Sequence, residues 1–239
     1  MSRAATGEGT LVVLDIDGTL LDTPHLPAWR RGLARVLGDH APDRSAEISV
    51  EQYHRHVAGR PRQVGAAAAL GIAGLDPTPE LVEELAVVKQ ELFLEQAEET
   101  VLFPDARDFL DAAAREGTPV AFCTASRNAG ELLAKRLPGL DGGDWLLDRL
   151  HQSLGPHGHY GDVPRPEALR RVARAWNWSP DRCVLVDDAL SGVLAGQEVG
   201  MRPVLLDRFG LGVAAPGCPV VATLDELRPL PGGLRLPVA

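Results

Sequence analysis

The sequence LVVLDIDGTL, residues 11–20, carries the strongest structural signal in the chain. Its four leading apolar residues predict a buried strand of a parallel sheet. Ligands of open α/β sheets bind outside the carboxyl ends of the strands, where Asp15 and Asp17 stand. The two acids alternate along an extended backbone, so we expect their side chains to share one face. Two carboxylates at such short range repel each other unless a cation or a shared proton balances their charge. The pattern suits a magnesium site in which one carboxylate attacks and the other moves a proton.

Composition excludes several function classes. The chain has 239 residues, 45% of them hydrophobic and 24% charged, which is ordinary for a globular protein. A formal net charge of −9 argues against nucleic-acid and anionic-membrane partners. No apolar run is long enough to span a membrane, the first residues lack a signal-peptide core, and the three cysteines show no metal-binding spacing. We therefore expect a cytoplasmic protein, and nothing in the sequence indicates its oligomeric state.

The pattern of apolar residues changes near residue 100. Residues 23–100 predict helices almost throughout, whereas strands and helices alternate from residue 101 onward. This order predicts an α/β fold with a doubly wound parallel sheet. We expect a core domain formed by residues 1–22 and 101–239, and an α-helical cap domain at 23–100 inserted above the strand ends.

The clearest helix of the insert begins at Thr78-Pro79, a capping hydroxyl followed by a proline. Its apolar stripe is Leu81, Leu85, Val88 and Leu92, and its expected solvated face is Glu83, Glu84, Gln90 and Glu91. Farther along, we expect a helix near 128–137 and a loose segment rich in Gly, His and Pro over 138–164.

The run from Asp15 to Leu20 resembles motif I of the haloacid dehalogenase-like superfamily, whose core is a Rossmann-like sheet. The resemblance implies that Asp15 is the nucleophile that forms an aspartyl-phosphate and that Asp17 is the general acid/base. Both roles agree with general chemistry: a carboxylate nucleophile splits the transfer into two steps, and a positioned acid protonates the leaving oxygen. The dehalogenase and phosphonatase branches lack an acid at the position of Asp17, so its presence implies phosphoryl transfer.

Two later strands resemble further motifs of this superfamily. Residues 122–126 end a strand with Thr124, which by resemblance to motif II hydrogen-bonds a phosphoryl oxygen. Residues 184–188 end a strand with the acid pair of motif IV. The resemblance implies Mg²⁺ as cofactor, bound by Asp15, the Asp17 backbone carbonyl and Asp188, with Asp187 as a ligand or an outer group. Mg²⁺ prefers such oxygen ligands.

The insert resembles the helical cap of β-phosphoglucomutase-like members. By that resemblance His25 lies near the hinge, Arg62 binds a distal phosphate of the substrate, and Ser126, Arg127 and Asn128 contact substrate phosphate. Arginine suits this task because it grips phosphate in bidentate fashion. The alternatives stay open: an ordinary helix-cap histidine for His25, and solvated arginines for Arg62 and Arg127.

Motif III departs from the pattern. The superfamily places a lysine there, and ungapped counting from Asp187 puts Val163 at that position. Valine carries no charge, so we expect Arg165, two residues on, to take over the role, with His157 or His159 as weaker candidates. If none of them does, the site is slower or has lost catalysis.

Three functions follow as hypotheses. The first is a Mg²⁺-dependent phosphatase of a small phosphorylated metabolite, of sugar- or cyclitol-phosphate type. The second is a sugar-phosphate mutase of the β-phosphoglucomutase type. The third, which only the missing motif III lysine favours, is a catalytically impaired domain that works as a binding module.

Overall fold

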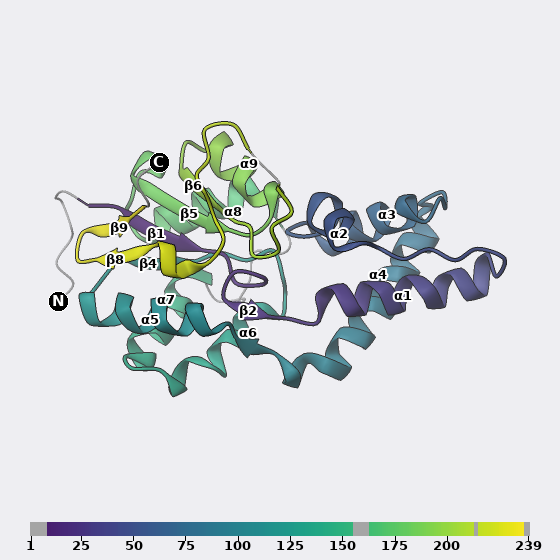
Figure 1. Ribbon diagram of the computed structural model, residues 1–239, viewed down its shortest axis with the longest axis horizontal. Coiled ribbons are helices and arrows are strands. Elements are labelled where there is room, and N and C mark those ends of the chain that lie inside the picture. Colours follow the sequence, from purple (N-terminus) through teal and green to yellow (C-terminus); the bar gives the residue numbers. More distant parts are fainter. Residues whose placement is uncertain (1–8, 155–162, 213–214, 237–239) are drawn as a thin grey trace.

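The computed structural model describes residues 9–154, 163–212 and 215–236, and its centre is a five-stranded parallel sheet (Figure 1). The strand order is β4-β1-β5-β6-β7. The strands are β1 (Leu11–Leu14), β4 (Val120–Phe122), β5 (Cys183–Asp187), β6 (Arg202–Leu206) and β7 (Val220–Val221). β1 lies between β4 and β5, with Leu14 opposite Phe122 and Val186. The register therefore brings the residues that follow these three strands to one edge of the sheet.

The sheet is buried on both faces because its strands alternate between two hydrophobic clusters. Val12 and Leu14 pack into one cluster, while Leu11 and Val13 pack into the other. The first cluster contains side chains of α5 (Pro104–Glu116), α6 (Ala129–Ala134) and α7 (Gly143–Leu154). The second contains side chains of α8 (Arg165–Ala175) and α9 (Leu190–Glu198). Helices thus cover both faces, which explains the unbroken apolar run of β1 and confirms the predicted doubly wound fold.

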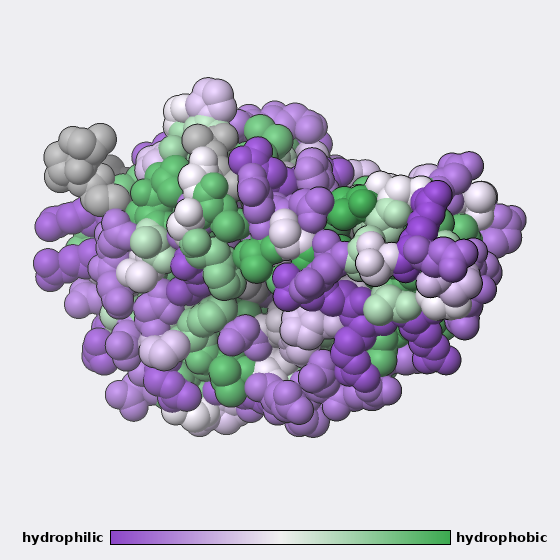
Figure 2. All heavy atoms as spheres, turned by 45° about the vertical axis from the view of Figure 1, so that its right-hand side comes forward, coloured by the Kyte–Doolittle hydropathy of each residue, from purple (hydrophilic) through white to green (hydrophobic). Residues whose placement is uncertain are grey.

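The four helices α1 to α4, which follow β1 in the chain and precede α5, form a second, helical body beside the sheet (Figure 1). They are α1 (His25–His40), α2 (Val50–His56), α3 (Arg62–Ile72) and α4 (Pro79–Gln96). They enclose a hydrophobic cluster of their own, built around Trp29, Leu33, Leu70 and Leu85. We refer to this body as the cap. Hydrophilic residues predominate on the face of the molecule shown in Figure 2, and the hydrophobic ones lie in scattered groups.

The chain enters and leaves the cap through two short strands, β2 (Leu21–Asp22) and β3 (Val101–Leu102). The two strands pair in antiparallel fashion, Leu21 with Leu102 and Asp22 with Val101. This pair lies at the domain limits expected from the sequence, and the division into domains at these limits stays a proposal.

Helix α4 differs from its expected pattern at two positions. Leu85 and Leu92 are buried as expected, but Lys89 lies on the same face and is only 3% exposed. Gln90 was expected on the solvated face, and this is wrong. Its side chain instead exchanges hydrogen bonds with Asn128 of the core. The reason is that α4 packs both against the other cap helices and against the core, so its buried surface is wider than one apolar stripe.

Within the segment 138–164, residues 143–154 are not the loose connection that the composition predicts, and residues 155–162 lie outside the described residues. A short 3₁₀ turn, Leu137–Gly139, precedes α7, and Leu146, Leu150 and Leu154 of α7 are buried at helical spacing. Glycine, histidine and proline at the two ends of the segment hid this amphipathic stretch. The helix expected near 128–137 is shorter and ends at Ala134.

The remaining elements of the described residues are three 3₁₀ turns and a hairpin. The turns are Ala97–Glu99, Pro180–Arg182 and Leu224–Glu226, and the hairpin is β8 (Arg228–Leu230) with β9 (Gly233–Arg235). Among the helices of the described residues, none combines the length and the apolar character that crossing a membrane requires.

Candidate active site

A cavity of about 270 Å³ lies between the carboxyl edge of the sheet and the cap. Seven residues singled out from the sequence line it from the core or the hinge: Asp15, Asp17, His25, Thr124, Ser126, Arg127 and Asn128. Asp188 lines it beside them, and Arg62 lines it from the cap. Asp187 and Arg165 lie behind this lining, and Arg165 contacts both Asp15 and Asp187. The fold thus gathers residues that are up to 173 positions apart in the sequence.

Three acidic side chains lie together at the carboxyl edge of the sheet, and two of them, Asp15 and Asp188, line the cavity. Carboxylate oxygens of Asp15, Asp187 and Asp188 lie within 4.8 Å of one another. Thr19 donates a hydrogen bond to Asp188 over 3.3 Å, and the backbone amide of Ala189 donates to Asp187 over 2.9 Å. These bonds hold Asp187 and Asp188 in place at the end of β5.

Two glycines make the close packing of these acids possible. Gly18 has a φ of +78°, and a Cβ at this position would collide with the carboxylate of Asp188. A Cβ on Gly192, at the start of α9, would collide with the carboxylate of Asp187. Both glycines are therefore required because a carboxylate fills the space that a side chain would need.

Two of these acids, Asp15 and Asp188, are unusually hard to ionise. Burial raises the pKa of Asp15 well above its ordinary value, and the negative charge of Asp187 raises it further. Burial is also the main cause that raises the pKa of Asp188 to about 8, and the negative charge of Asp187 is the second. Three buried acids with one nearby guanidinium carry an excess of negative charge, and that excess opposes ionisation.

Arg165 is the guanidinium that partly balances this charge. Its Nη2 atom donates hydrogen bonds to Asp15 Oδ1 over 2.5 Å and to Asp187 Oδ2 over 2.6 Å. Arg165 is the first residue of α8 and its side chain is 7% exposed. Val163, at the position where a motif III lysine was expected, packs instead against the hydrophobic cluster of that face. His157 and His159 lie outside the described residues.

Asp17 has a different environment from Asp15. His25 Nε2 lies 3.2 Å from Asp17 Oδ1, and the hydroxyl of Thr124 donates to Asp17 Oδ2 over 3.4 Å. Burial by itself raises the pKa of Asp17, but the adjacent His25 outweighs it and the pKa falls below its ordinary value. The surroundings therefore push the pKa values of the two acids of LVVLDIDGTL in opposite directions.

The sequence reasoning missed Lys89, which reaches His25 from the cap. Its Nζ lies 2.7 Å from His25 Nδ1 and over the rings of Trp29 and Phe93. Burial, followed by the charge of Arg62, lowers the pKa of Lys89 to about 7. An ammonium donor at Nδ1 leaves the proton of a neutral His25 on Nε2, facing Asp17. The sequence did carry a signal for Lys89, because its spacing from Leu85 and Leu92 places it on the apolar face of α4.

Positive charge also gathers on the cap side of the cavity. Arg62 begins α3, and burial lowers its pKa, with the charge of Arg127 lowering it further. The two arginines and Lys89 therefore lie near one another, across from the acids. Ser126 and Asn128 belong to the loop after β4, where the backbone amide of Ser126 donates to Thr124. The side-chain amides of Asn128 and Gln90 form hydrogen bonds with each other, so Asn128 connects the core to the cap.

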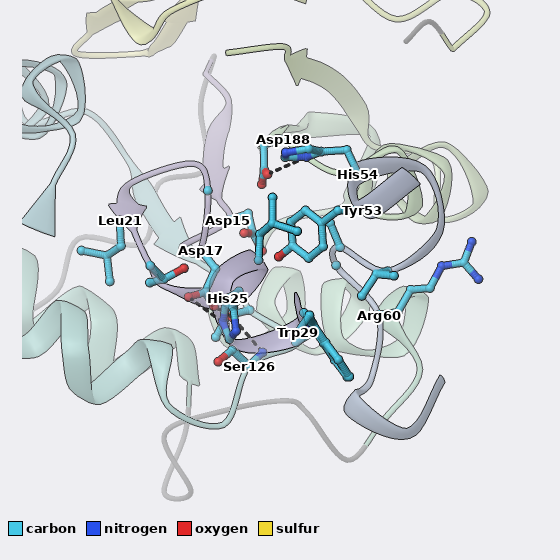
Figure 3. A pocket seen from close by; sticks show the side chains of 18 of the residues that line it. Asp15, Asp17, Leu21, His25, Trp29, Tyr53, His54, Arg60, Ser126 and Asp188 are labelled. Carbon is cyan, nitrogen blue, oxygen red and sulfur yellow. Dashed lines mark hydrogen bonds and ion pairs between the residues drawn. The ribbon is translucent and has the colours of Figure 1, made fainter. Parts of the chain in front are cut away.

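Helix α2 brings two further side chains that sequence reasoning missed. Tyr53 and His54 both line the cavity (Figure 3). His54 Nδ1 lies 3.7 Å from Asp188 Oδ2, and its ring packs against Phe209, with ring centroids 5.0 Å apart. The sequence around these residues carries no motif that marks them.

The acid triad fits a divalent cation. Asp15, Asp187 and Asp188 are the group of described residues whose ligand atoms could hold a metal ion together. Mg²⁺ prefers carboxylate oxygens, and two positive charges would balance the excess that raises the pKa values of Asp15 and Asp188. The carboxylate of Asp17 is not in this group. Binding through the Asp17 backbone carbonyl stays a prediction.

Comparison with known families bears directly on this site. The family model described as haloacid dehalogenase-like hydrolase matches residues 10–200, which include all four acids and Arg165. The chain belongs to the haloacid dehalogenase-like hydrolases. The family resemblance inferred from the motifs is thereby confirmed, and within this family Arg165 stands close to where the motif III lysine was expected.

Relatives of this haloacid dehalogenase-like hydrolase include a mutase and a phosphatase. A protein of Mycobacterium bovis named beta-phosphoglucomutase is 29% identical, with 90% of each chain covered. A Pseudomonas putida protein named phosphoglycolate phosphatase is also 29% identical, over 95% of this chain and 80% of its own. The solved structure of a Clostridium difficile beta-phosphoglucomutase has a TM-score of 0.67 at 19% identity, over 91% of this chain and 92% of its own. That similarity establishes the shared fold of core and cap.

Proposed function

We propose that this protein is a Mg²⁺-dependent phosphatase that hydrolyses a small phosphorylated metabolite through an aspartyl-phosphate on Asp15. The observation that carries the proposal is the contact of Arg165 with both Asp15 and Asp187. The missing motif III lysine was the one argument for an impaired domain, and Arg165 supplies a fixed positive charge at the nucleophile. Its Nε and Nη1 atoms are buried and have no hydrogen-bond partner among the described residues.

The reaction follows from the roles of the two carboxylates. Asp15 attacks phosphorus, the bond from phosphorus to the leaving oxygen breaks, and Asp17 protonates the leaving alcohol. Ionised Asp17 then takes a proton from water, which attacks the phosphoryl group and releases Asp15. His25 touches Asp17 through Nε2 and orients its carboxyl group for both proton transfers. When bound by Asp15 and Asp188, with Asp187 as a further ligand or an outer partner, Mg²⁺ supplies charge that keeps these acids ionised and offsets the phosphoryl charge.

The basic side of the cavity indicates the class of substrate. Arg62 and Arg127 line the cavity across from the acids, and Lys89 lies beside them. We propose that they bind a second anionic group, such as a distal phosphate, because guanidinium groups bind such oxyanions strongly. The cavity of about 270 Å³ favours a substrate of sugar-phosphate or cyclitol-phosphate size. The cap would exclude bulk water while it holds such a substrate.

A sugar-phosphate mutase of the β-phosphoglucomutase type is the second candidate. Two observations favour it: the name of the Mycobacterium bovis relative and the basic groups facing the acids. The chemistry at Asp15 and Asp17 is the same, but the phosphoryl group returns to a sugar hydroxyl and not to water. The two candidates therefore differ in product and share the site.

The test is phosphate release from a panel of phosphorylated metabolites with Mg²⁺. We expect release by the natural protein and none by Asp15→Asn, with Asp181→Asn, an exposed acid, as the matched control. Release that persists in Asp15→Asn would refute the nucleophile assignment. Conversion of β-glucose 1-phosphate to the 6-phosphate identifies the mutase. Absence of any turnover while Mg²⁺ still binds identifies a binding module.

A further inference from the structure

Tyr53 projects from the cap toward the acids of the core. It lies in α2, whose first turn is fixed by a capping box in which Ser49 and Gln52 bond each other's backbone amides. Tyr53 lines the cavity, and Figure 3 shows its hydroxyl end directed toward Asp15. A short helix with a well-defined start therefore presents one phenol to the site.

The ring of Tyr53 is held in place by its neighbours. It packs edge-on against His54, with ring centroids 5.1 Å apart, and His54 in turn packs against Phe209 of the core. Close by, Ser191 of α9 donates a hydrogen bond to the backbone oxygen of Ala58 over 3.1 Å. These contacts fix α2 against the core, so the position of Tyr53 is set by both bodies of the protein.

The hydroxyl of Tyr53 has no assigned partner. Within the part of the chain that the structure describes, no side chain or backbone group forms a hydrogen bond with it. Burial raises the pKa of Tyr53 well above its ordinary value, and the charges of Asp188, Asp17 and Asp15 raise it further. The group therefore keeps its proton and faces the space beside three acids as an unused donor.

We propose that the Tyr53 hydroxyl donates a hydrogen bond to an oxygen of the phosphoryl group that Asp15 attacks, and is thus a catalytic residue supplied by the cap. This inference rests on the proposed phosphatase function. The phosphoryl group must lie against Asp15 for attack, which is the side toward which Tyr53 points. A phenol adds a donor there without changing the charge of the site. Because α2 belongs to the cap, the donor is in place only while the cap lies on the core.

The test compares the natural protein with Tyr53→Phe, which keeps the ring and removes the hydroxyl. Loss of one hydrogen bond to a charged oxygen lowers kcat/KM by about 10- to 100-fold. Inorganic phosphate contains only the phosphoryl part of a substrate. Its affinity for Tyr53→Phe, measured by calorimetry in the presence of Mg²⁺, should therefore be about tenfold or more weaker than its affinity for the natural protein. Glu51→Gln, on the exposed side of α2, is the control and should leave both values unchanged. Thermal unfolding of all three proteins checks that the fold is retained.

Each outcome has a definite meaning. Parallel losses in kcat/KM and in phosphate affinity support the proposal. A loss in kcat/KM with unchanged phosphate affinity overturns it, because the hydroxyl then contacts the organic part of the substrate. Unchanged values of both also overturn it, while turnover by the natural protein leaves the proposed function standing. If the natural protein turns over no substrate, the proposed function itself has failed.

Discussion

Arg165 and Asp15 are 150 positions apart in the sequence, yet Nη2 of the arginine lies 2.5 Å from Oδ1 of the aspartate. The same nitrogen lies 2.6 Å from Asp187, so one buried donor joins the nucleophile candidate of β1 to the acid that ends β5. The charge of this site thus comes from the first turn of α8, two residues after the position at which the lysine was expected.

Replacing Arg165 tests the importance of this contact. Arg165→Ala leaves Asp15 and Asp187 unpaired in a buried site, so we expect about 3 to 5 kcal/mol less unfolding free energy. We expect kcat to fall about 100- to 1,000-fold because a fixed positive charge at the phosphoryl group is lost. Arg165→Lys keeps a point charge and should recover activity to within about tenfold of the natural protein.

The matched control for Arg165 is Arg170→Ala. Arg170 lies on the same helix, is exposed, and pairs only with Glu198 over 3.6 Å among the described residues. Urea unfolding and steady-state kinetics of the three variants separate stability from catalysis. Activity of Arg165→Ala equal to that of Arg170→Ala would contradict the role of the guanidinium.

Metal binding should depend on pH. Because the folded state raises the pKa of Asp188 to about 8, it keeps a proton that the unfolded chain loses near pH 4. The folded state thus binds more protons in this interval, and without Mg²⁺ the unfolding free energy falls as pH rises from about 4 to about 8. Mg²⁺ needs the ionised acids, so its stabilising effect should grow over the same interval.

Thermal unfolding with and without Mg²⁺, at about pH 6 and about pH 8, measures this effect. We expect the larger rise in Tm at the higher pH. Asp188→Asn should largely abolish it. An equal Mg²⁺ response at both pH values in the natural protein would show that the acid triad does not bind the ion.

Lys89 should give the protein a second pH dependence of opposite sign. Its pKa is about 7 in the folded state, so between about 7 and about 10.4 the unfolded chain binds a proton that the folded state does not. The unfolding free energy contributed by Lys89 therefore rises with pH in this interval. Lys89→Met should remove this contribution and the transition near pH 7 in the profile of kcat/KM.

The other lysine of the chain provides the control. Lys135 is an exposed residue whose side chain pairs with Glu98 and Glu131. Lys135→Met should leave the transition near pH 7 in place. If Lys89→Met retains it as well, Lys89 is not the group that titrates there.

Arg62 should set selectivity for a second anionic group. For substrates with two phosphates, Arg62→Met should raise KM by about 10- to 100-fold, because a charged hydrogen bond is lost. For substrates with one phosphate and no other charge, KM should change less than about threefold. Kinetics on such a matched pair of substrates measures the difference. Arg35→Met, an exposed arginine of α1, is the control, and equal effects on both substrates would contradict the assignment.

The sequence predicts the parts of this molecule that repeat locally. The apolar run of β1, its acids and the glycine after them predict both the sheet and the edge where the site lies, because strand alternation and sheet topology are general rules. The cap was predicted for the same reason, since helical periodicity dominates residues 23–100.

The parts that escaped prediction depend on contacts between distant segments. Gln90 looks solvated by periodicity and is not, because the core residue Asn128 meets it. Tyr53 and His54 have no local signature, since only the packing of α2 on the core brings them to the acids. Arg165 could be named as a candidate, but its contact with Asp15 depends on how α8 packs against β1 and β5.

The antiparallel pair of β2 and β3 determines how the cap is able to move. Both crossings between core and cap run through this one ribbon, where Leu21 meets Leu102 and Asp22 meets Val101. Two separate connecting segments would let the cap slide and twist relative to the core, but a hydrogen-bonded ribbon bends as a single unit. Rotation of the cap about this ribbon would move Tyr53, His54, Arg62 and Lys89 together. The hydrogen-bond donors and the charges of the cap would therefore reach the site at the same time.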